Sequence, residues 1–184
     1  MVHSCVLAGV GGQGVLYITR IMHDAAVLEG RRVMASETHG MAQRGGSVVS
    51  HLRMDQGASP LIRKGTADLL MVFEPEETFR TLSYLKRQGD LIINASSSQI
   101  LGAVGDYLNR RGDRIHLLNA SAMADEMGNS QASNVILLGF AAGRVSFPFS
   151  SQSVKTAIEH ATRPSSREKN LTALERGLEA GLRP

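Results

Sequence analysis

The chain has 184 residues, of which 42% are hydrophobic and 20% charged, and it carries a formal net charge of +3. This length and composition are those of one soluble globular domain that can bury a sizeable core. The sequence contains no apolar run long enough to span a bilayer, no signal-peptide layout at its N-terminus and no basic stripe interleaved with aromatic residues. We therefore expect a cytoplasmic protein that binds neither membranes nor nucleic acid.

Cys5 is the only cysteine and limits the redox chemistry of the chain. One thiol cannot form an internal disulfide, and it cannot by itself hold an iron–sulfur cluster that needs four thiolates. We expect Cys5 to be a small buried side chain of a strand.

The first element is a predicted strand over 6–8 that meets a glycine-rich turn, Gly9-Val-Gly-Gly-Gln-Gly14. A predicted helix over 15–28 follows, and this is the context that a dinucleotide-binding turn requires. Glycines allow close backbone approach, and free N–H groups at a helix start attract an anion. The alternative is a tight strand-to-helix turn that binds no ligand. The amide of Gln13 has the reach to contact a ligand or a neighbouring chain.

The second and third predicted strands, over 32–36 and 46–54, are separated by a connection of 37–45 only. A parallel return needs a crossover of a dozen or more residues. The two strands are therefore expected to be antiparallel or to splay apart. This departs from a standard nucleotide-binding half, in which a helix follows the second strand.

The rest of the chain alternates strands and helices. Further strands are predicted over 68–73, 90–94 and 114–118, and helices over 74–86, 100–109, 119–127, 134–143, 150–161 and 165–182. The helix over 134–143 is rich in Gly and Ala and is expected to be buried against a close neighbour. The whole predicts a single α/β domain over 1–184, a three-layer α/β/α fold with a mostly parallel, mixed sheet and a Rossmann-like first unit. Its C-terminal helices begin at about 150.

The connection Ser36–Ser47 concentrates polar groups and glycines. A strand's C-terminal end faces the same rim as the glycine turn, so Glu37, His39 and Arg44 are expected to converge with 11–14. Arg44 beside Gly45-Gly46 suits a phosphate or carboxylate, because a guanidinium fork and open N–H groups can act together.

Single residues of this connection leave alternatives open. Glu37 lies where an NAD site has its ribose-binding acid, and equally it can pair with Arg44. His39 is a base, a pH-sensitive contact or a structural hydrogen-bonding group. No acid pair or triad indicates catalysis by this chain alone. The other histidines show no metal-ligand spacing and are interpreted as structural or surface residues: His3, His23, His51, His116 and His160.

Three stretches together resemble one family: the glycine turn, Ser36-Glu-Thr-His-Gly-Met-Ala-Gln-Arg-Gly-Gly-Ser47, and Asp68-Leu-Leu-Met-Val-Phe-Glu-Pro75. That family is the gamma-type domain of the 2-oxoacid:ferredoxin oxidoreductases. Within it, the second stretch is most similar to the beta subunit of indolepyruvate:ferredoxin oxidoreductase. Asn94 and Asn134 also fit the family layout.

The resemblance implies the small subunit of an anaerobic, cytoplasmic complex. Its larger partner would carry thiamine diphosphate and the iron–sulfur clusters, decarboxylate an aryl 2-oxoacid, form the acyl-CoA and reduce ferredoxin. This chain alone would bind no cofactor, and in isolation it is open to self-association. The resemblance further implies a partner interface or coenzyme A phosphate contacts at ten residues: Gly11, Gly12, Gln13, Gly14, Glu37, His39, Arg44, Gly45, Gly46 and Ser47.

Two other classes of protein remain as alternatives. A stand-alone NAD(P)-binding oxidoreductase is favoured by the glycine spacing and Glu37, but not by the short connection after the second strand. A non-catalytic scaffold subunit would use the glycine turn only to dock a partner.

Overall fold

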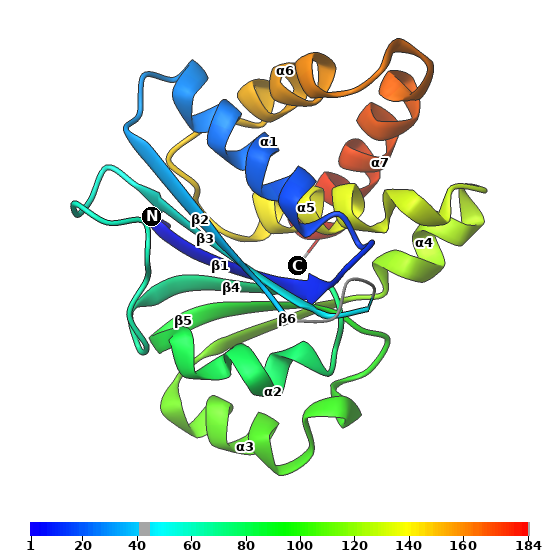
Figure 1. Ribbon diagram of the computed structural model, residues 1–184. Coiled ribbons are helices and arrows are strands. Elements are labelled where there is room, and N and C mark those ends of the chain that lie inside the picture. The colour runs from blue at the N-terminus through cyan, green and yellow to red at the C-terminus, as the bar shows by residue number, and fades with distance from the viewer. Residues whose placement is uncertain (41–44, 184) are drawn as a thin grey trace.

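The computed structural model describes residues 1–40 and 45–183, and these form three layers (Figure 1). A six-stranded sheet lies in the middle. Helices α1, α4, α5, α6 and α7 cover one face, and the shorter α2 and α3 cover the other. None of the helices in these residues is long and apolar enough to cross a membrane. The predicted α/β/α arrangement is confirmed.

The strands are, in chain order, β1 Ser4–Val10, β2 Val33–His39, β3 Ser47–Met54, β4 Ala67–Val72, β5 Leu85–Asn94 and β6 Arg114–Leu118. The helices are α1 Val15–Leu28, α2 Glu77–Thr81, α3 Gly102–Arg111, α4 Ala120–Glu126, α5 Ser133–Arg144, α6 Ser151–Ala161 and α7 Pro164–Leu182. Short 3₁₀ turns precede or follow three of them, at Leu82–Tyr84, Ser98–Leu101 and Ser130–Ala132.

The strand order is β2-β3-β1-β4-β5-β6. β1, β4, β5 and β6 are parallel, whereas β3 runs antiparallel to both of its neighbours. The prediction of a mixed sheet with an antiparallel second and third strand is therefore confirmed. The connection between those two strands is a hairpin loop, which is too short for a crossover.

β1 lies at the centre of the sheet because it is apolar on both faces. Cys5, Val6, Leu7 and Ala8 are all fully buried. Cys5 and Leu7 belong to the core beneath α1, α5, α6 and α7, and Val6 to the smaller core beneath α2 and α3. Continuous apolar sequence is what a strand covered on both sides requires.

Several predicted boundaries are wrong, among them the start of the strand predicted over 90–94, which lies at Leu85. β2 continues to His39, so part of the expected connection is strand, because an edge strand tolerates polar residues on its exposed sides. The helix predicted over 74–86 ends at Thr81. Tyr84 instead packs edge-on against His51, and Leu85 pairs with Ala67 of β4. These tertiary contacts override the helical pattern of the segment.

Helices α5 and α7 cross at two pairs of glycines. A Cβ built on Gly177 would lie 2.0 Å from the carbonyl oxygen of Ile136, and one on Gly139 would lie 2.3 Å from that of Leu174. Gly143 and Gly181 approach each other in the same way one turn further on. Because the neighbouring atoms are backbone, they cannot move aside as a side chain would. The expected close packing of the Gly- and Ala-rich helix is confirmed.

We predict that Gly177→Ala lowers the free energy of unfolding by at least about 1–3 kcal/mol, the usual cost of overpacking a core. Urea unfolding of the purified chain measures it. Gly105→Ala is the matched control, because that helical glycine would meet only the side chain of Leu101. Equal stability of the two variants would contradict the prediction.

Glu29 joins the end of α1 to the start of α6. Its Oε1 accepts hydrogen bonds from the backbone N–H of Ser150, at 2.6 Å, and from the hydroxyl of Ser153, at 2.7 Å. The bond from Ser153, followed by those from Ser150, lowers the pKa of Glu29 from 4.5 to about 2. The carboxylate thus helps to cap α6.

We predict that the extra stability of wild type over Glu29→Gln is full above pH 4.5 and is lost as the pH falls towards about 2. The sign follows because the folded protein binds this proton more weakly than the unfolded chain does. Unfolding free energies of both proteins across this pH range measure the difference. Glu179→Gln, at an exposed position of α7, is the control for the loss of one carboxylate.

Candidate functional site

The glycine turn joins β1 to α1. Gly14 caps the helix in the left-handed conformation, with φ 74°. A Cβ at this position would lie 2.2 Å from the side-chain nitrogen of Asn134 on α5. Gly14 is therefore required both for its backbone angles and for the close approach of α5.

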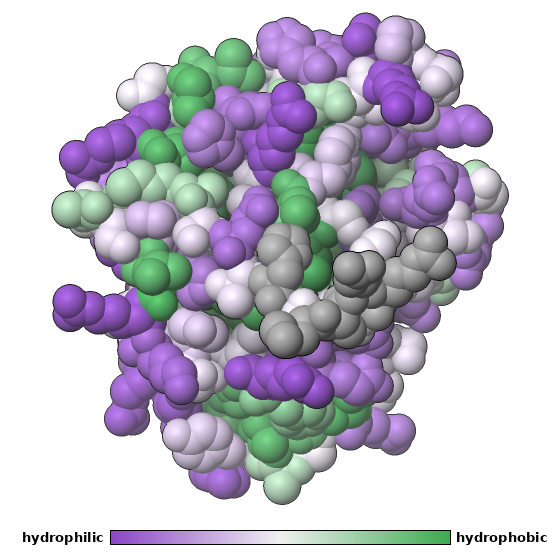
Figure 2. Space-filling model, viewed as in Figure 1, coloured by the Kyte–Doolittle hydropathy of each residue, from purple (hydrophilic) through white to green (hydrophobic). Residues whose placement is uncertain are grey.

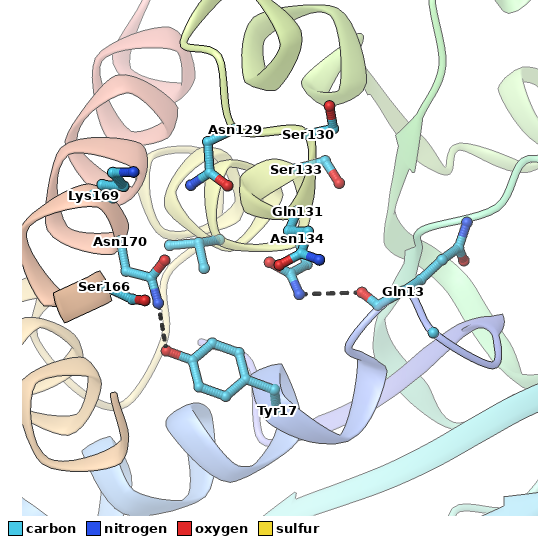
Figure 3. A pocket seen from close by; sticks show the side chains of 12 residues that line it. Gln13, Tyr17, Asn129, Ser130, Gln131, Ser133, Asn134, Ser166, Lys169 and Asn170 are labelled. Atoms are coloured by element: carbon cyan, nitrogen blue, oxygen red, sulfur yellow. Dashed lines mark hydrogen bonds between the residues drawn. The ribbon is translucent and has the colours of Figure 1, made fainter. Parts of the chain in front are cut away.

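Gln13 holds the turn in place through three hydrogen bonds. Its Oε1 accepts from the N–H of Val10 at 2.9 Å, and its Nε2 donates to Glu74 at 2.7 Å. Its carbonyl oxygen accepts from Asn134 at 3.1 Å. Figure 3 shows the Gln13 side chain directed away from Tyr17 and Asn134. The amide expected to contact a ligand or a neighbouring chain thus ties the turn to the end of β4.

The start of β3 lies against the same turn. The N–H of Gly11 donates to the carbonyl of Gly46 at 2.9 Å, and that of Gly40 donates to the carbonyl of Ser47 at 2.8 Å. The Ser47 hydroxyl donates to Glu77 at 2.5 Å. The first of these bonds joins the glycine turn, at Gly11, to the predicted connection over 36–47, at Gly46. The two stretches therefore meet on one rim of the sheet. Arg44 lies outside the described residues.

Glu37 and His39 lie on β2, which β3 separates from β1. His39 pairs with Val48, and Val48 pairs with Gly9 on its other side. Two strand spacings of about 4.8 Å therefore separate β2 from the glycine turn. A dinucleotide-binding half has these two strands adjacent, so the topology does not favour a ribose-binding role for Glu37.

Three acidic residues follow β4 at this rim: Glu74, Glu76 and Glu77. A hydrogen bond with the Glu76 carboxylate, followed by burial, raises the pKa of Glu74. Glu77 is 5% exposed and pairs with Arg80 at 3.4 Å. Negative charge on this side of the turn leaves the opposite side, towards α5 and α7, as the one suited to an anion.

Two hollows flank the glycine turn. One, of about 400 Å³, is lined by apolar and glycine residues that include Val10, Leu16 and Val48. The other, of about 740 Å³, lies towards α5 and α7. Figure 3 shows Tyr17, Asn134, Lys169 and Asn170 around this larger cavity. Tyr17, Lys169 and Asn170 are not among the site residues predicted from the sequence. Tyr17 lies one helical turn beyond Gly14, but nothing local indicates that α7 returns to this place.

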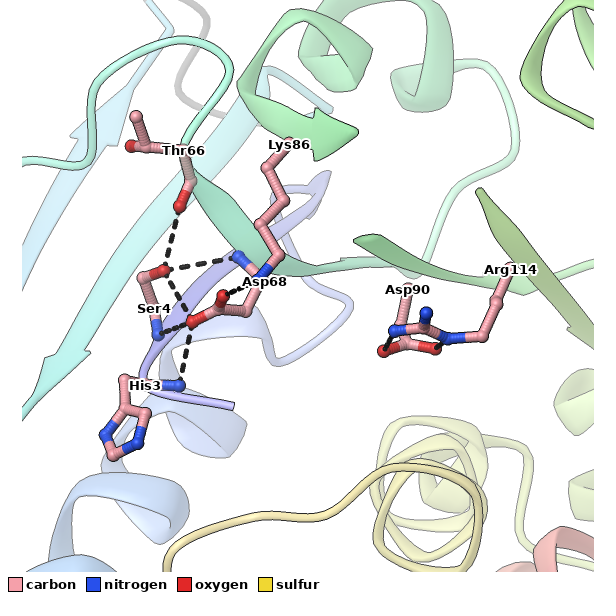
Figure 4. A network of polar contacts seen from close by, with 7 residues as sticks. All are labelled: His3, Ser4, Thr66, Asp68, Lys86, Asp90 and Arg114. Carbon is pink, nitrogen blue, oxygen red and sulfur yellow. Dashed lines mark hydrogen bonds and ion pairs between the residues drawn. The ribbon is translucent and has the colours of Figure 1, made fainter. Parts of the chain in front are cut away.

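A second polar cluster lies at the amino ends of the parallel strands (Figure 4). Asp68 accepts from the N–H groups of His3 and Ser4, each at 2.9 Å, and pairs with Lys86. Asp90 binds Arg114 through two bonds of 2.7 Å. The pKa values of both aspartates are lowered, although burial opposes this, by bonds from Lys86 to Asp68 and from His116 and Arg114 to Asp90. The carboxylates of Asp68 and Asp90 thus bind groups of the same domain and hold its strands together.

The groups that could bind a metal ion are dispersed over the described part of the chain. Across residues 1–40 and 45–183, no three His, Cys, Asp or Glu side chains lie close enough to hold a metal ion. Cys5 is fully buried, and burial, followed by the nearby Asp68 charge, raises the pKa of its thiol well above 9.0. These residues do not fit an iron–sulfur cluster, which is held by several thiolates.

A family model described as pyruvate ferredoxin/flavodoxin oxidoreductase matches residues 4–180. The chain belongs to this family. It is 35% identical to the indolepyruvate oxidoreductase subunit IorB of Archaeoglobus fulgidus, over 95% of this chain and 92% of the relative. It is a gamma-type subunit of a 2-oxoacid:ferredoxin oxidoreductase, as the three sequence stretches indicate.

Two solved structures show the same fold. A keto/oxoacid ferredoxin oxidoreductase gamma subunit from Geobacter sulfurreducens superposes with a TM-score of 0.77 at 20% identity, over 98% of both chains. A 2-oxoglutarate:ferredoxin oxidoreductase from Magnetococcus marinus, with 2-oxoglutarate, coenzyme A and succinyl-CoA bound, gives 0.78 at 18% identity. That match covers 98% of this chain and 31% of the longer one.

We predict that Gln13→Leu lowers the unfolding free energy by about 1–3 kcal/mol, because the N–H of Val10 loses its acceptor. Urea unfolding measures the loss. Gln152→Leu, at an exposed position of α6, makes the same change without breaking a hydrogen bond of the described residues. A Gln13 variant as stable as this control would show that the turn is held by other contacts.

Proposed function

We propose that this chain is the small subunit of an indolepyruvate, or aryl 2-oxoacid, ferredoxin oxidoreductase. The complex would decarboxylate the oxoacid, transfer the acyl unit to coenzyme A and reduce ferredoxin. The observation that carries the proposal is the similarity to an indolepyruvate oxidoreductase subunit, which extends over more than nine tenths of both chains. The stretch Ser36–Ser47 supports the same assignment.

The chemistry would be divided between two subunits. Thiamine diphosphate, held by the larger partner, supplies the carbanion chemistry of decarboxylation. The iron–sulfur clusters would also belong to the partner, since the only cysteine of this chain is buried within β1. This chain would shape the pocket, exclude water and orient coenzyme A.

We propose that these roles are performed by the rim of the sheet that carries the glycine turn. Gly11–Gly14 and 44–47 would contact the partner or the phosphates of coenzyme A, and Glu37 and His39 would border them. The backbone bond from Gly11 to Gly46 supports a joint role for the two stretches. Glycine turns at helix starts favour anions because their N–H groups are open.

The chain is also proposed to work only within an assembly. In the Magnetococcus relative the matched region is 31% of a longer chain, so there this fold has further protein attached. Figure 2 shows hydrophobic side chains gathered over α2 and α3. Phe79 of α2 is 49% exposed, and Ile100 and Val104 are partly buried against the smaller core beneath α2 and α3. Exposed apolar areas of this kind mark protein interfaces. The occupant we propose is the larger subunit, and ferredoxin would bind through the complex.

The test is an anaerobic purification of the tagged chain from its native cells, followed by an assay of viologen reduction that depends on 2-oxoacid and coenzyme A. A large brown partner with thiamine diphosphate and indolepyruvate-driven activity is expected. Activity with a different 2-oxoacid would correct the substrate. A colourless chain that NAD(H) stabilises would contradict the proposal and favour the nucleotide-binding alternative, and an inactive complex would favour a scaffold.

We predict that Arg44→Ala raises the KM for coenzyme A or lowers the yield of assembled complex, because a cation beside Gly45-Gly46 is lost. Steady-state kinetics and size-exclusion chromatography of the complex measure the two effects. Arg176→Ala, at an exposed position of α7, is the control for the loss of one positive charge. If both variants assemble and turn over like wild type, Arg44 has no such role.

A further inference from the structure

The amino ends of the parallel strands form the rim of the sheet that lies opposite the glycine turn, here called the amino rim. The turn after α1, the end of β3 with the loop that follows it, the start of β5, the connection from α3 to β6 and the ends of α5 and α7 all reach this rim. Its basic residues are Arg31, Arg32, Arg53, Arg63, Lys64, Lys86, Arg87, Arg110, Arg111, Arg114, Arg144 and Arg183. Its acidic residues are Glu29, Asp55, Asp68, Asp90 and Asp113.

The charge of the chain is unevenly distributed between this rim and the rest of the molecule. The whole chain has 20 Lys and Arg residues against 17 Asp and Glu residues. Twelve of these basic residues but only five of the acidic ones belong to the amino rim, so the remainder of the chain is net negative. Such an asymmetry gives one end of a molecule a positive potential, which attracts and orients an acidic partner.

The aspartates of the amino rim use up only part of its positive charge. Each of the four pairs with one cation, and two of these pairs are drawn in Figure 4: Arg31–Asp55, Lys86–Asp68, Arg111–Asp113 and Arg114–Asp90. Glu29 binds the start of α6 instead. The other basic residues of the rim make no ion pair with any residue that the structure describes: Arg32, Arg53, Arg63, Lys64, Arg87, Arg110, Arg144 and Arg183.

Three of these cations without an ion pair gather where β4 and β5 begin. The N–H of Gly65 donates to the carbonyl of Ser83 at 2.8 Å, which holds the loop before β4 against the segment that leads into β5. Arg63 and Lys64 directly precede this bond on one side, and Arg87 follows it on the other. All three residues are exposed. They are therefore placed to bind carboxylates of another molecule.

Exposed apolar side chains lie among the cations of the rim. Met1 is 71% exposed, Leu61 55% and Leu182 72%. The carbonyl of Leu61 accepts from the guanidinium of Arg53 at 2.9 Å, and Met1 lines a hollow of about 240 Å³ together with Arg114. Methionine and arginine are enriched in the surfaces that proteins use to bind one another. The rim thus has both the charge and the apolar side chains of a protein interface.

The kind of cation and its neighbours favour a protein over other polyanions. Ten of the twelve basic residues of the rim are arginine, which is enriched in protein interfaces, whereas lysine is depleted there. Arg114 shows the geometry that the others can offer, since it binds Asp90 through two bonds of 2.7 Å. The rim's own carboxylates oppose a continuous run of phosphates. A protein surface can place acidic groups opposite the arginines and other groups opposite the aspartates.

We propose that the amino rim docks an acidic face of the larger subunit, whose Asp and Glu side chains bind Arg63, Lys64 and Arg87. The inference rests on the proposed function for the identity of this partner, and it adds a contact surface on the rim opposite the glycine turn. The apolar area over α2 and α3 leads into this surface, because α3 ends at Arg110 and Arg111. One partner can therefore cover both.

Titration calorimetry of the full chain with poly-L-glutamate tests the rim without the partner. We expect binding that weakens as the salt concentration rises, because salt screens exposed charges. Arg63→Glu together with Arg87→Glu should raise the Kd at least about tenfold, a change of ~1.4 kcal/mol. Arg167→Glu together with Arg176→Glu, at exposed positions of α7, changes the net charge equally and should have a smaller effect. Absence of binding to wild type, or equal effects of the two pairs, would overturn the inference.

Titrations with duplex DNA and with phosphatidylserine vesicles separate a protein partner from other polyanions. Both probes are expected to bind more weakly than poly-L-glutamate, because phosphates meet the carboxylates of the rim. Tighter binding of either probe that is lost with Arg63→Glu and Arg87→Glu would overturn the choice of a protein.

Carbodiimide cross-linking of the purified complex identifies the residues that touch the rim, because the reagent joins a lysine amine to a carboxylate in contact with it. Lys64 is expected to be linked to an Asp or Glu of the larger subunit, as mass spectrometry of the digested product would show. Lys64→Arg keeps the charge and should remove the link without preventing assembly. An unlinked Lys64, or a link only to this chain or to a second copy of it, would overturn the inference.

The complex also separates this inference from the proposed function. If it oxidises indolepyruvate but the Arg63→Glu and Arg87→Glu pair assembles as well as the α7 control pair, the rim assignment fails and the proposed function stands. If Lys64 is linked to a larger subunit but the complex oxidises no 2-oxoacid, the proposed function fails and the rim assignment stands.

Discussion

The crossing of α5 over α7 is the contact on which the rest of this rim depends. Two glycine pairs let the backbones approach to distances at which even one methyl group would collide with a carbonyl oxygen. Each helix then contributes to a different part of the site. α5 brings Asn134 to the carbonyl of Gln13, and α7 brings Lys169 and Asn170 opposite the glycine turn. This single buried contact thus places Asn134 beside Gln13, although the two residues are 121 positions apart in the sequence.

The antiparallel β3 determines what the glycine turn can bind. In a sheet with adjacent first and second strands, an acidic residue after the second strand reaches the ribose of a dinucleotide. Here β3 occupies that position, and the carbonyl of Gly46 at its start accepts the N–H of Gly11. The acidic residues near the turn come from the end of β4 instead. The spacing of the glycines is shared with dinucleotide-binding proteins, but the surroundings of the turn are not.

Much of the fold could be predicted because local patterns and tertiary packing agree. The α1 helix and β6 begin and end where the sequence pattern predicts, and the short connection after β2 correctly indicates an antiparallel strand. The helix expected over 74–86 could not be corrected from sequence, since Leu85 joins β4 only once the sheet exists. For the site, the glycine turn and Gly46 could be found from their composition. Tyr17 and Lys169 could not, because their meeting is set by the path of α7, and no local periodicity encodes that path.

The hydrogen bond from the N–H of Gly40 to the carbonyl of Ser47 closes the base of the β2–β3 loop. Because the two ends of the loop are fixed to each other, residues can be added or removed between them without shifting a strand. Doubling the length of such a loop costs only about 0.6 kcal/mol of closure entropy. Related subunits can therefore diverge in this segment while keeping the same scaffold. Exchanging the loop between relatives is therefore expected to leave the host domain folded.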